Sequence, residues 1–246
     1  SFVLRNGIYG GNGVYFQLVD SNDKQKKFLE NKSQGELRFI AKAMNFSKIS
    51  GSPIAYWVSE ALPNAFSKGR MMTTYCDTFL GIITGDNDKF LREWFEVENN
   101  KIVFHGNSMD AIDLKKQYWI PYNKGGEFRR WYGIQDDVIN WKNGPTDKRR
   151  GKQDYSKYYL REYVAWSYTI SSSAKTIATR YYPNGFLWDV RGSGIFDKSN
   201  NMLYLTALIS SKVGFSLLRV KTRALSCQVE NIAEMPVIID EKNRGQ

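Results

Sequence analysis

The sequence predicts an α+β fold, with mixed β-sheets and several helices. Short runs rich in β-branched and aromatic residues alternate with turns of Gly, Asn and Asp, which is typical of strands. A few segments have helical spacing instead, and no regular strand–helix alternation indicates a parallel βαβ sheet. The chain has 246 residues and a hydrophobic content of 42%, enough to bury a sizeable core.

The first third of the chain predicts one strand and up to two helices. Glycines at positions 7, 10, 11 and 13 predict a hairpin turn that leads into a strand over residues 14–19. The Lys-rich stretch 21–35 is interpreted as a helix or a linker. Ser52-Pro53 predicts a helix start, because Ser caps helices and Pro favours their first turn. That helix should run through Leu62 and end at Pro63 or Gly69.

The central and C-terminal parts predict most of the strands and two further helices. A strand over residues 78–84 should close in a turn at Gly85–Asp88. Further strands are predicted at residues 101–105, 118–121, 138–141, 164–170, 176–181 and 185–190. Gly192-Ser193-Gly194 is interpreted as a tight turn. Helical spacing predicts a helix over residues 202–220 with Asn200 as its cap, and a short helix over 228–234 before Pro236.

Positive charge is concentrated in one segment. The net charge is +10, and residues 115–180 carry 14 Lys and Arg against 6 Asp and Glu, whereas residues 1–114 carry 13 of each. Such clustering is typical of a surface that binds a polyanion. A solvated basic face is the alternative. No amphipathic helix with a basic face coincides with the segment, which disfavours a membrane surface. Nucleic acid is the favoured partner.

Within this segment, residues 121–133 (PYNKGGEFRRWYG) combine glycines, cations and aromatic residues in one short loop. That mixture suits a surface that holds a phosphate backbone and touches bases, although a charged hairpin tip that contacts only water has the same composition. The predicted phosphate contacts are Lys124, Arg129, Arg130, Lys148, Arg149, Arg150 and Lys152. The candidates for base edges are Asn87, Asn123 and Arg191. Tyr122 and Trp131 are expected to pack the loop or to brace an extruded base.

Few residues are available for catalysis. His105 is the single histidine, and metal sites built on several His or Cys are excluded. Asp110 and Asp113 have a faint nuclease-like spacing, which leaves a metal-dependent nuclease as a weak third hypothesis. Cys76 and Cys227 are interpreted as inert core thiols, which fits a reducing cytoplasm. The longest apolar stretch, residues 202–218, is too polar to cross a membrane.

Several motifs together resemble one protein family. They are SGSPIAYWVS at residues 50–59, TGDNDKF at 84–90, YNKGGEFRRWYG at 122–133 and DVRGSGIF at 189–196. In this order they resemble PglX, the adenine-specific DNA methyltransferase family of BREX phage-defence systems, and type IIG restriction–modification enzymes share the general plan. The resemblance covers nearly the whole chain.

The resemblance implies methyl transfer from S-adenosylmethionine to adenine N6 in the parent enzyme, but not in this chain. The family's Asn/Asp-Pro-Pro-Tyr/Phe motif is missing, because the six prolines follow Ser, Leu, Ile, Gly, Tyr or Met. We therefore expect a non-catalytic C-terminal fragment with no cofactor of its own. Residues 1–48 would be the end of the methyltransferase portion and a linker, 49–240 a recognition domain similar to that of type I specificity subunits, and 241–246 a truncated tail.

The implied partners are double-stranded DNA, the upstream methyltransferase domain of the same parent chain and other defence-system subunits. The alternative function is a protein-interaction module in a phage-defence complex. In that case the aromatic surface would dock another subunit.

Overall fold

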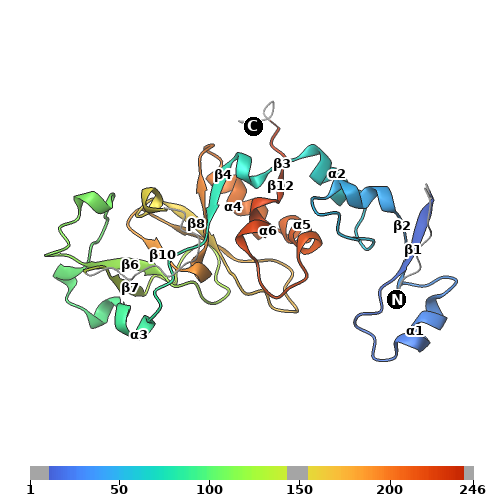
Figure 1. Cartoon of the computed structure of the whole chain (residues 1–246), viewed down its shortest axis with the longest axis horizontal. Coiled ribbons are helices and arrows are strands. Elements are labelled where there is room, and N and C mark those ends of the chain that lie inside the picture. The colour runs from blue at the N-terminus through green and yellow to red at the C-terminus, as the bar shows by residue number, and fades with distance from the viewer. Residues whose placement is uncertain (1–10, 143–154, 241–246) are drawn as a thin grey trace. The chain divides into compact units, whose positions relative to one another are not determined.

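The computed structural model describes residues 11–142 and 155–240, which form two compact units. Within the described residues, the first unit comprises residues 11–70 and 238–240, and the second comprises residues 71–142 and 155–237 (Figure 1). The described residues form helices together with small mixed and antiparallel sheets, so the predicted α+β class is confirmed. The assignment of residues 1–48, 49–240 and 241–246 to functional parts stays a prediction, and residues 241–246 lie outside the described residues.

The first unit is built on a two-stranded antiparallel sheet. Strand β1 (Asn12–Phe16) pairs with β2 (Arg38–Lys42), and helix α1 (Lys24–Asn31) lies between them in sequence. A 3-10 helix (Ala43–Lys48) and α2 (Ala61–Lys68) follow. Residues 14–16 of the predicted strand and the core of the predicted segment 21–35 are confirmed as strand and helix.

The predicted helix that starts at Ser52 is wrong in its first half. Ser52 has a φ of 45°, directly after Gly51 at 80°, so the chain makes a tight turn there. A capping residue needs extended backbone instead. The helix begins only at Ala61, and it ends before Gly69 as predicted.

The first sheet of the second unit has the order β10-β6-β7-β5. Its strands are β10 (Leu187–Trp188), β6 (Trp119–Asn123), β7 (Asp137–Asn140) and β5 (Leu91–Glu93), with α3 (Asn87–Phe90) just before β5. Strand β10 is parallel to β6, and the other pairs are antiparallel. Ile120, Tyr122 and Ile139 pack in one buried cluster with Ile82 and Leu187.

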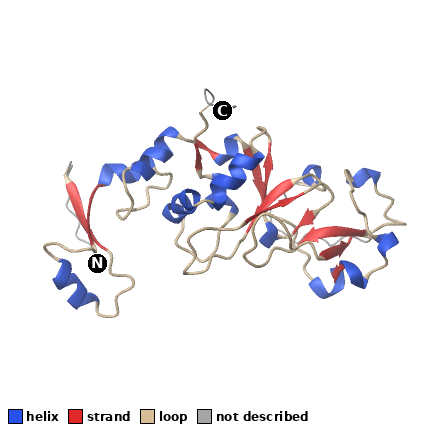
Figure 2. Cartoon of the chain, turned by 180° about the vertical axis from the view of Figure 1, so that it is seen from behind, coloured by secondary structure: helices blue, strands red, loops and turns tan. Residues whose placement is uncertain are grey.

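The second sheet is antiparallel throughout and has the order β4-β11-β8-β9. Its strands are among those drawn in red in Figure 2. Its strands are β4 (Cys76–Phe79), β11 (Gly194–Asp197), β8 (Tyr163–Trp166) and β9 (Thr179–Tyr182). The core beside it is aromatic: Tyr163 stacks on Tyr182 with ring centroids 5.1 Å apart, and Trp188 and Phe196 pack against Tyr163.

Strand β10 connects the two cores. Leu187 belongs to the aliphatic cluster and Trp188 to the aromatic one. Beside it, the Ile82 N–H donates to the Trp188 carbonyl at 2.7 Å, and a Cβ on Gly81 would come within 2.2 Å of the Asp189 backbone. The residue that follows β10, Asp189, is therefore fixed at the junction of both sheets.

The C-terminal part of the second unit is helical. Helices α4 (Met202–Ser210), α5 (Lys212–Lys221) and α6 (Val229–Ala233) lead to β12 (Pro236–Val237), which pairs with β3 (Arg70–Met71). Figure 1 shows these helices at one end of the unit and β6 and β7 at the other. The short helix before Pro236 is confirmed.

The single helix predicted over residues 202–220 is wrong, because α4 and α5 meet at Ser211 with a bend of 71°. Ser211 has extended backbone, and its side chain caps α5 by accepting the Gly214 N–H. Asn201, not Asn200, occupies the capping position of α4. No single helix among the described residues is long and apolar enough to cross a membrane. Only this bent pair meets the length and composition criteria, and only when its two halves are taken together.

The other strand predictions are confirmed in part. Strands occur within or beside the segments predicted at 78–84, 118–121, 138–141, 164–170, 176–181 and 185–190. The strand predicted at 101–105 is wrong: Ile102 forms one bridge with Trp119, and His105 is left-handed at a φ of 60°. The turn predicted at 85–88 instead caps and begins α3, because the Asp86 side chain accepts the Lys89 N–H. The interpreted turn at 192–194 leads directly into β11, which the sequence analysis missed.

Candidate nucleic-acid interface

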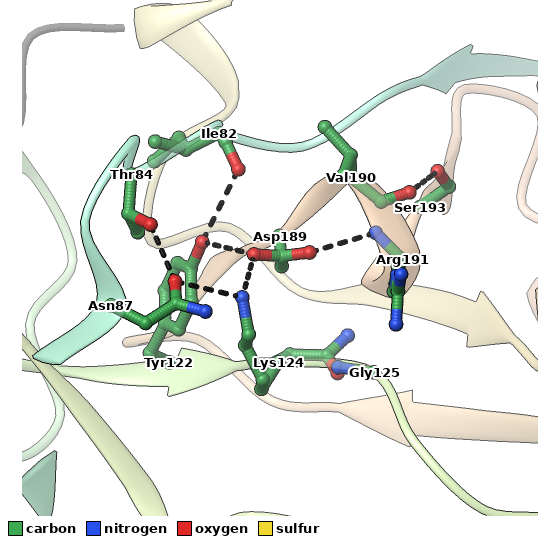
Figure 3. Close-up of polar contacts among 11 residues, drawn as sticks. Ile82, Thr84, Asn87, Tyr122, Lys124, Gly125, Asp189, Val190, Arg191 and Ser193 are labelled. Carbon is green, nitrogen blue, oxygen red and sulfur yellow. Dashed lines mark hydrogen bonds and ion pairs between the residues drawn. The ribbon is translucent and has the colours of Figure 1, made fainter. Parts of the chain in front are cut away.

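Three segments distant in sequence meet where β6 and β10 end (Figure 3). They are the segment from Ile82 to Asn87, the end of β6 from Tyr122 to Gly125, and the turn Asp189–Ser193. Together they line an open depression of about 360 Å³. The parallel pairing of β6 and β10 brings these segments together. Asn123 lies opposite Trp188, so the residues that follow the two strands leave the sheet at the same edge.

Asp189 is the centre of the buried polar network beneath this depression. Its side chain is 4% exposed, and one carboxylate oxygen accepts from the Tyr122 hydroxyl at 3.0 Å and from Lys124 Nζ at 2.6 Å. The other oxygen accepts the Arg191 backbone N–H at 3.0 Å. Burial, reinforced by Asp189, raises the pKa of Tyr122 far above its usual range, so this phenol stays a proton donor.

A second buried network holds the loop after β6. The Asn123 side chain donates to the Gly192 carbonyl at 3.1 Å and accepts from the Gly125 N–H at 2.9 Å and the Tyr182 hydroxyl at 3.0 Å. Gly125 has a φ of +77°, and a Cβ there would come within 2.5 Å of the Arg191 carbonyl oxygen. Only glycine allows the loop and the turn 189–193 to approach so closely.

Asn87 lies on the exposed side of the depression, at the start of α3. Its amide oxygen accepts from the Thr84 hydroxyl at 2.6 Å and from Lys124 Nζ at 3.2 Å. Lys124 therefore joins the exposed amide to the buried carboxylate of Asp189. Arg191 is exposed across the same depression.

The loop over residues 126–133 presents aromatic side chains to solvent. Phe128 is 59% exposed, Trp131 54% and Tyr132 67%. Backbone hydrogen bonds from Trp131 to Thr179 and from Tyr181 to Trp131, at 2.8 and 3.0 Å, attach the loop to β9. From beneath, the fully buried Arg180 donates to the carbonyls of Glu127 and Arg129, each at 3.1 Å.

The predicted site residues have different environments. Asn87, Lys124 and Arg191 lie together at the depression, and Arg129 and Trp131 are exposed on the loop. Arg130 is half-buried, bonds the Thr176 hydroxyl and lies over the Phe128 ring at 5.3 Å. The predicted contacts outside the described residues are Lys148, Arg149, Arg150 and Lys152.

Tyr122 and Asn123 require a correction as contact residues. Both side chains are fully buried, with 0% exposure, so in this structure they hold the loop in place instead of facing a ligand. For Tyr122 this is the packing role that was one of its two expected roles. Its hydroxyl is used by Asp189 and the Ile82 carbonyl.

Sequence reasoning missed Asp189, Arg180 and Thr84. A carboxylate directly after the apolar run Phe186-Leu187-Trp188 was a usable signal for Asp189, since ligands and polar networks gather at strand ends. Arg180 had no such signal, because an arginine in an alternating strand normally points to solvent.

The remaining candidates for chemistry do not assemble into a site. Asp113 pairs with Lys116 at 3.5 Å, and in the described part of the chain no three His, Cys, Asp or Glu residues are grouped as metal ligands. His105 is exposed at a left-handed position. Cys76 and Cys227 are buried free thiols, and burial raises the pKa of each to about 12, as expected of inert core cysteines.

Comparison with known proteins identifies relatives that match most of this chain. No protein-family profile matches the chain. It is 33% identical over 253 aligned residues to the adenine-specific methyltransferase PglX of Lacticaseibacillus casei (strain Zhang), covering 96% of this chain and 20% of that protein. It is also 33% identical over 217 residues to the adenine-specific methyltransferase BrxX of Escherichia coli O9:H4 (strain HS), covering 85% and 17%.

The chain thus spans a fifth or less of the length of the curated relatives that it matches. The predicted resemblance is confirmed: over most of its length this chain is related to one segment of the PglX and BrxX adenine-specific methyltransferases.

Proposed function

We propose that this chain is the DNA target-recognition region of an adenine-specific DNA methyltransferase of the restriction–modification or BREX type. It would bind duplex DNA and position it for methyl transfer by another part of the same protein. The observation that carries this proposal is the depression at which Asn87 and Arg191 are exposed above the buried Asp189 network. Base readout needs polar side chains on loops that a rigid scaffold positions in this way.

The loop over residues 126–133 supplies a second supporting feature. Arg129 is exposed beside three exposed aromatic residues, and Trp131 keeps a left-handed φ of 73°. Backbone strain of this kind costs about 1–2 kcal/mol, and such residues are frequent at functional sites. Arg129 is suited to a phosphate, and the aromatic rings to sugar or base faces.

Lys124 is no longer proposed as a phosphate contact. Its ammonium lies 2.6 Å from the buried Asp189 carboxylate, so its charge is already neutralised within the protein. Arg130 is also engaged, by Thr176 and by the Ser210 carbonyl at 3.4 Å. Among the described residues of the predicted set, Arg129 and Arg191 have guanidinium groups that form no hydrogen bond or ion pair with another described residue.

S-adenosylmethionine is the cofactor that adenine methyl transfer by the relatives implies. The described residues do not fit it. An acidic residue after a parallel strand commonly binds a nucleoside ribose, but here Asp189 is buried and is used by Tyr122 and Lys124. We therefore place cofactor binding and methyl transfer in parts of the whole protein outside this chain.

Salt dependence of DNA binding by the full-length protein tests the proposal. If about six cations contact phosphates, log K should fall against log salt with a slope of roughly −5. Arg129→Gln should make the slope shallower by about 0.9, because one phosphate contact is lost. Lys212→Gln is the matched control, since Lys212 is exposed on α5 outside the basic segment. A flat salt response of the wild-type protein would contradict DNA binding.

One observation favours a second function, docking of another protein. Trp94, Phe104 and Tyr132, each about half exposed or more, line a largely apolar pocket of about 390 Å³ together with Pro121 and Phe186. Exposed aromatic residues around a pocket are typical of protein interfaces.

Charge reversal at the basic positions separates the two functions. The changes would be made at Arg129, Arg149 and Arg150, and Arg130 would be left unchanged because it is half-buried and bonds Thr176 and Ser210. They should abolish DNA binding if the chain recognises DNA, and should leave partner binding unchanged if it is a docking module.

A further inference from the structure

The orientation of the Asn87 amide is set by its neighbours. Two donors, the Thr84 hydroxyl and the Lys124 ammonium, point at the same amide atom (Figure 3). An ammonium group can only donate, so the atom that faces it at 3.2 Å must be the amide oxygen. The NH₂ group is then the free end of this exposed side chain.

The neighbours are themselves fixed. Lys124 bonds Asp189, whose carboxylate is also held by the Tyr122 hydroxyl in the interior. Thr84 is 5% exposed and follows the bridge between Ile82 and Asp189. A continuous set of hydrogen bonds therefore runs from the core to the amide, and rotation of the amide would bring its NH₂ group against an ammonium group.

This fixed polarity limits what Asn87 can recognise. Asparagine usually reads adenine with both ends of its amide, donating to N7 and accepting from N6. Here both acceptor positions of the oxygen are already used by Thr84 and Lys124, so only donation remains. Arg191, across the same depression, is also a donor without acceptor capacity.

We propose that Asn87 is a specificity-determining residue that donates to an acceptor on a base edge in the major groove. The eligible atoms are N7 of a purine, O6 of guanine or O4 of thymine, and the N4 amino group of cytosine is rejected. This inference rests on the proposed DNA-recognition function and adds the chemical class of the base edge that the depression reads.

The test exchanges the donor for an acceptor of the same shape. In Asn87→Asp the carboxylate keeps its bonds to Thr84 and Lys124 and presents an oxygen outward. The full-length wild-type protein and variant would each select duplexes from a pool with randomised base pairs, and affinities for the selected duplexes would be measured. Asn107→Asp, an exposed residue outside the lining of the depression, is the matched control for added charge.

The variant should change its preference at one base-pair position, towards a base that presents an amino group there, N4 of cytosine or N6 of adenine, on the strand that it contacts. It should bind the wild-type site about 10- to 100-fold more weakly, the usual cost of a mismatched base contact. Asn107→Asp should select the wild-type sequence. Unchanged melting temperatures of both variants would show that folding is intact.

Each other outcome contradicts the inference. Uniform weakening on all duplexes would show that Asn87 contacts phosphate, and an unchanged sequence at unchanged affinity would show that it contacts nothing. In both cases the proposed DNA recognition would stand. If the wild-type protein selects no duplex at all, the proposed function fails, and this inference fails with it.

Discussion

At the scale of single residues, the candidate site depends on close backbone approach as much as on charge. Gly125 and Gly192 allow the loop after β6 and the turn 189–193 to touch, since a Cβ on Gly192 would lie 2.7 Å from the Asn123 amide nitrogen. The sequence indicated that glycines in this loop permit such an approach. It did not indicate what they approach, because the contacted turn lies more than 60 residues further along the chain.

Gly125→Ala should therefore destabilise the second unit more than a glycine change at another left-handed position where a Cβ would make only ordinary van der Waals contacts. Gly185 supplies that control, with a φ of +106° and its nearest atom at 3.4 Å. Gly185→Ala should cost about 1–2 kcal/mol of unfolding free energy from backbone strain alone. Gly125→Ala should cost roughly 1–3 kcal/mol more, because the Arg191 carbonyl must move. Urea unfolding would measure both, and equal losses would contradict the close contact.

Which residues face outward was also beyond sequence reasoning. Asn87, Asn123 and Lys124 looked alike as polar residues in motifs of the same resemblance. In the structure Asn123 is buried, Lys124 is paired and Asn87 is exposed. These differences depend on contacts with segments distant in sequence, which local sequence patterns do not show.

At the scale of elements, the strands with clear alternation or apolar runs were predictable, and the breaks between elements were not. Strands β6, β7, β8 and β9 could be predicted because the local strand preference of their residues agrees with the sheets in which they pack. The α4–α5 break was missed, since residues 202–220 keep helical spacing across Ser211. The break is a tertiary feature: a Cβ on Gly214 would come within 1.9 Å of the Leu208 carbonyl oxygen in α4.

Gly214→Ala consequently tests the α4–α5 packing, because its effect on stability should have the opposite sign from that in a free helix. In an unconstrained helix this change stabilises by about 1 kcal/mol, because alanine is the better helix former. Here we expect a loss of about 2 kcal/mol or more, since the methyl group would force α4 and α5 apart. Ser216→Ala, on the exposed side of α5, is the control and should be neutral or slightly stabilising. Circular-dichroism melting would decide, and a higher melting temperature for Gly214→Ala would refute the close packing.

At the scale of the whole molecule, the α+β class and the concentration of charge were accessible from composition and pattern. The division after residue 70 and the use of β10 by two cores were not, because they depend on which strands pair. The stability of the second unit depends both on single side chains and on the sheets that hold them. Its two sheets contain carboxylates whose environments act in opposite directions.

The two carboxylates are Asp77 in β4 and Asp137 in β7. Burial alone would raise the pKa of Asp77, but hydrogen bonds from Lys198 at 2.9 Å and from the Tyr158 hydroxyl at 2.8 Å outweigh it and lower the pKa. Burial raises the pKa of Asp137, only partly offset by Lys124. The first carboxylate therefore stabilises the fold when ionised, and the second opposes folding when ionised.

The pH dependence of two substitutions should consequently have opposite signs. Asp77 contributes stability that is present above its unfolded pKa of about 4 and is lost as the pH falls through its lower folded pKa. Asp77→Asn should therefore lower the free energy of unfolding at pH 7, and the difference from wild type should shrink in acid.

The stability associated with protonated Asp137 is present below pH about 4 and is lost as the pH rises through its raised folded pKa. Asp137→Asn should accordingly stabilise the protein at pH 7, with a benefit that vanishes in acid. Denaturant unfolding from pH 3 to pH 7 would measure both, and parallel curves for the two variants would show that these carboxylates do not differ as the structure indicates.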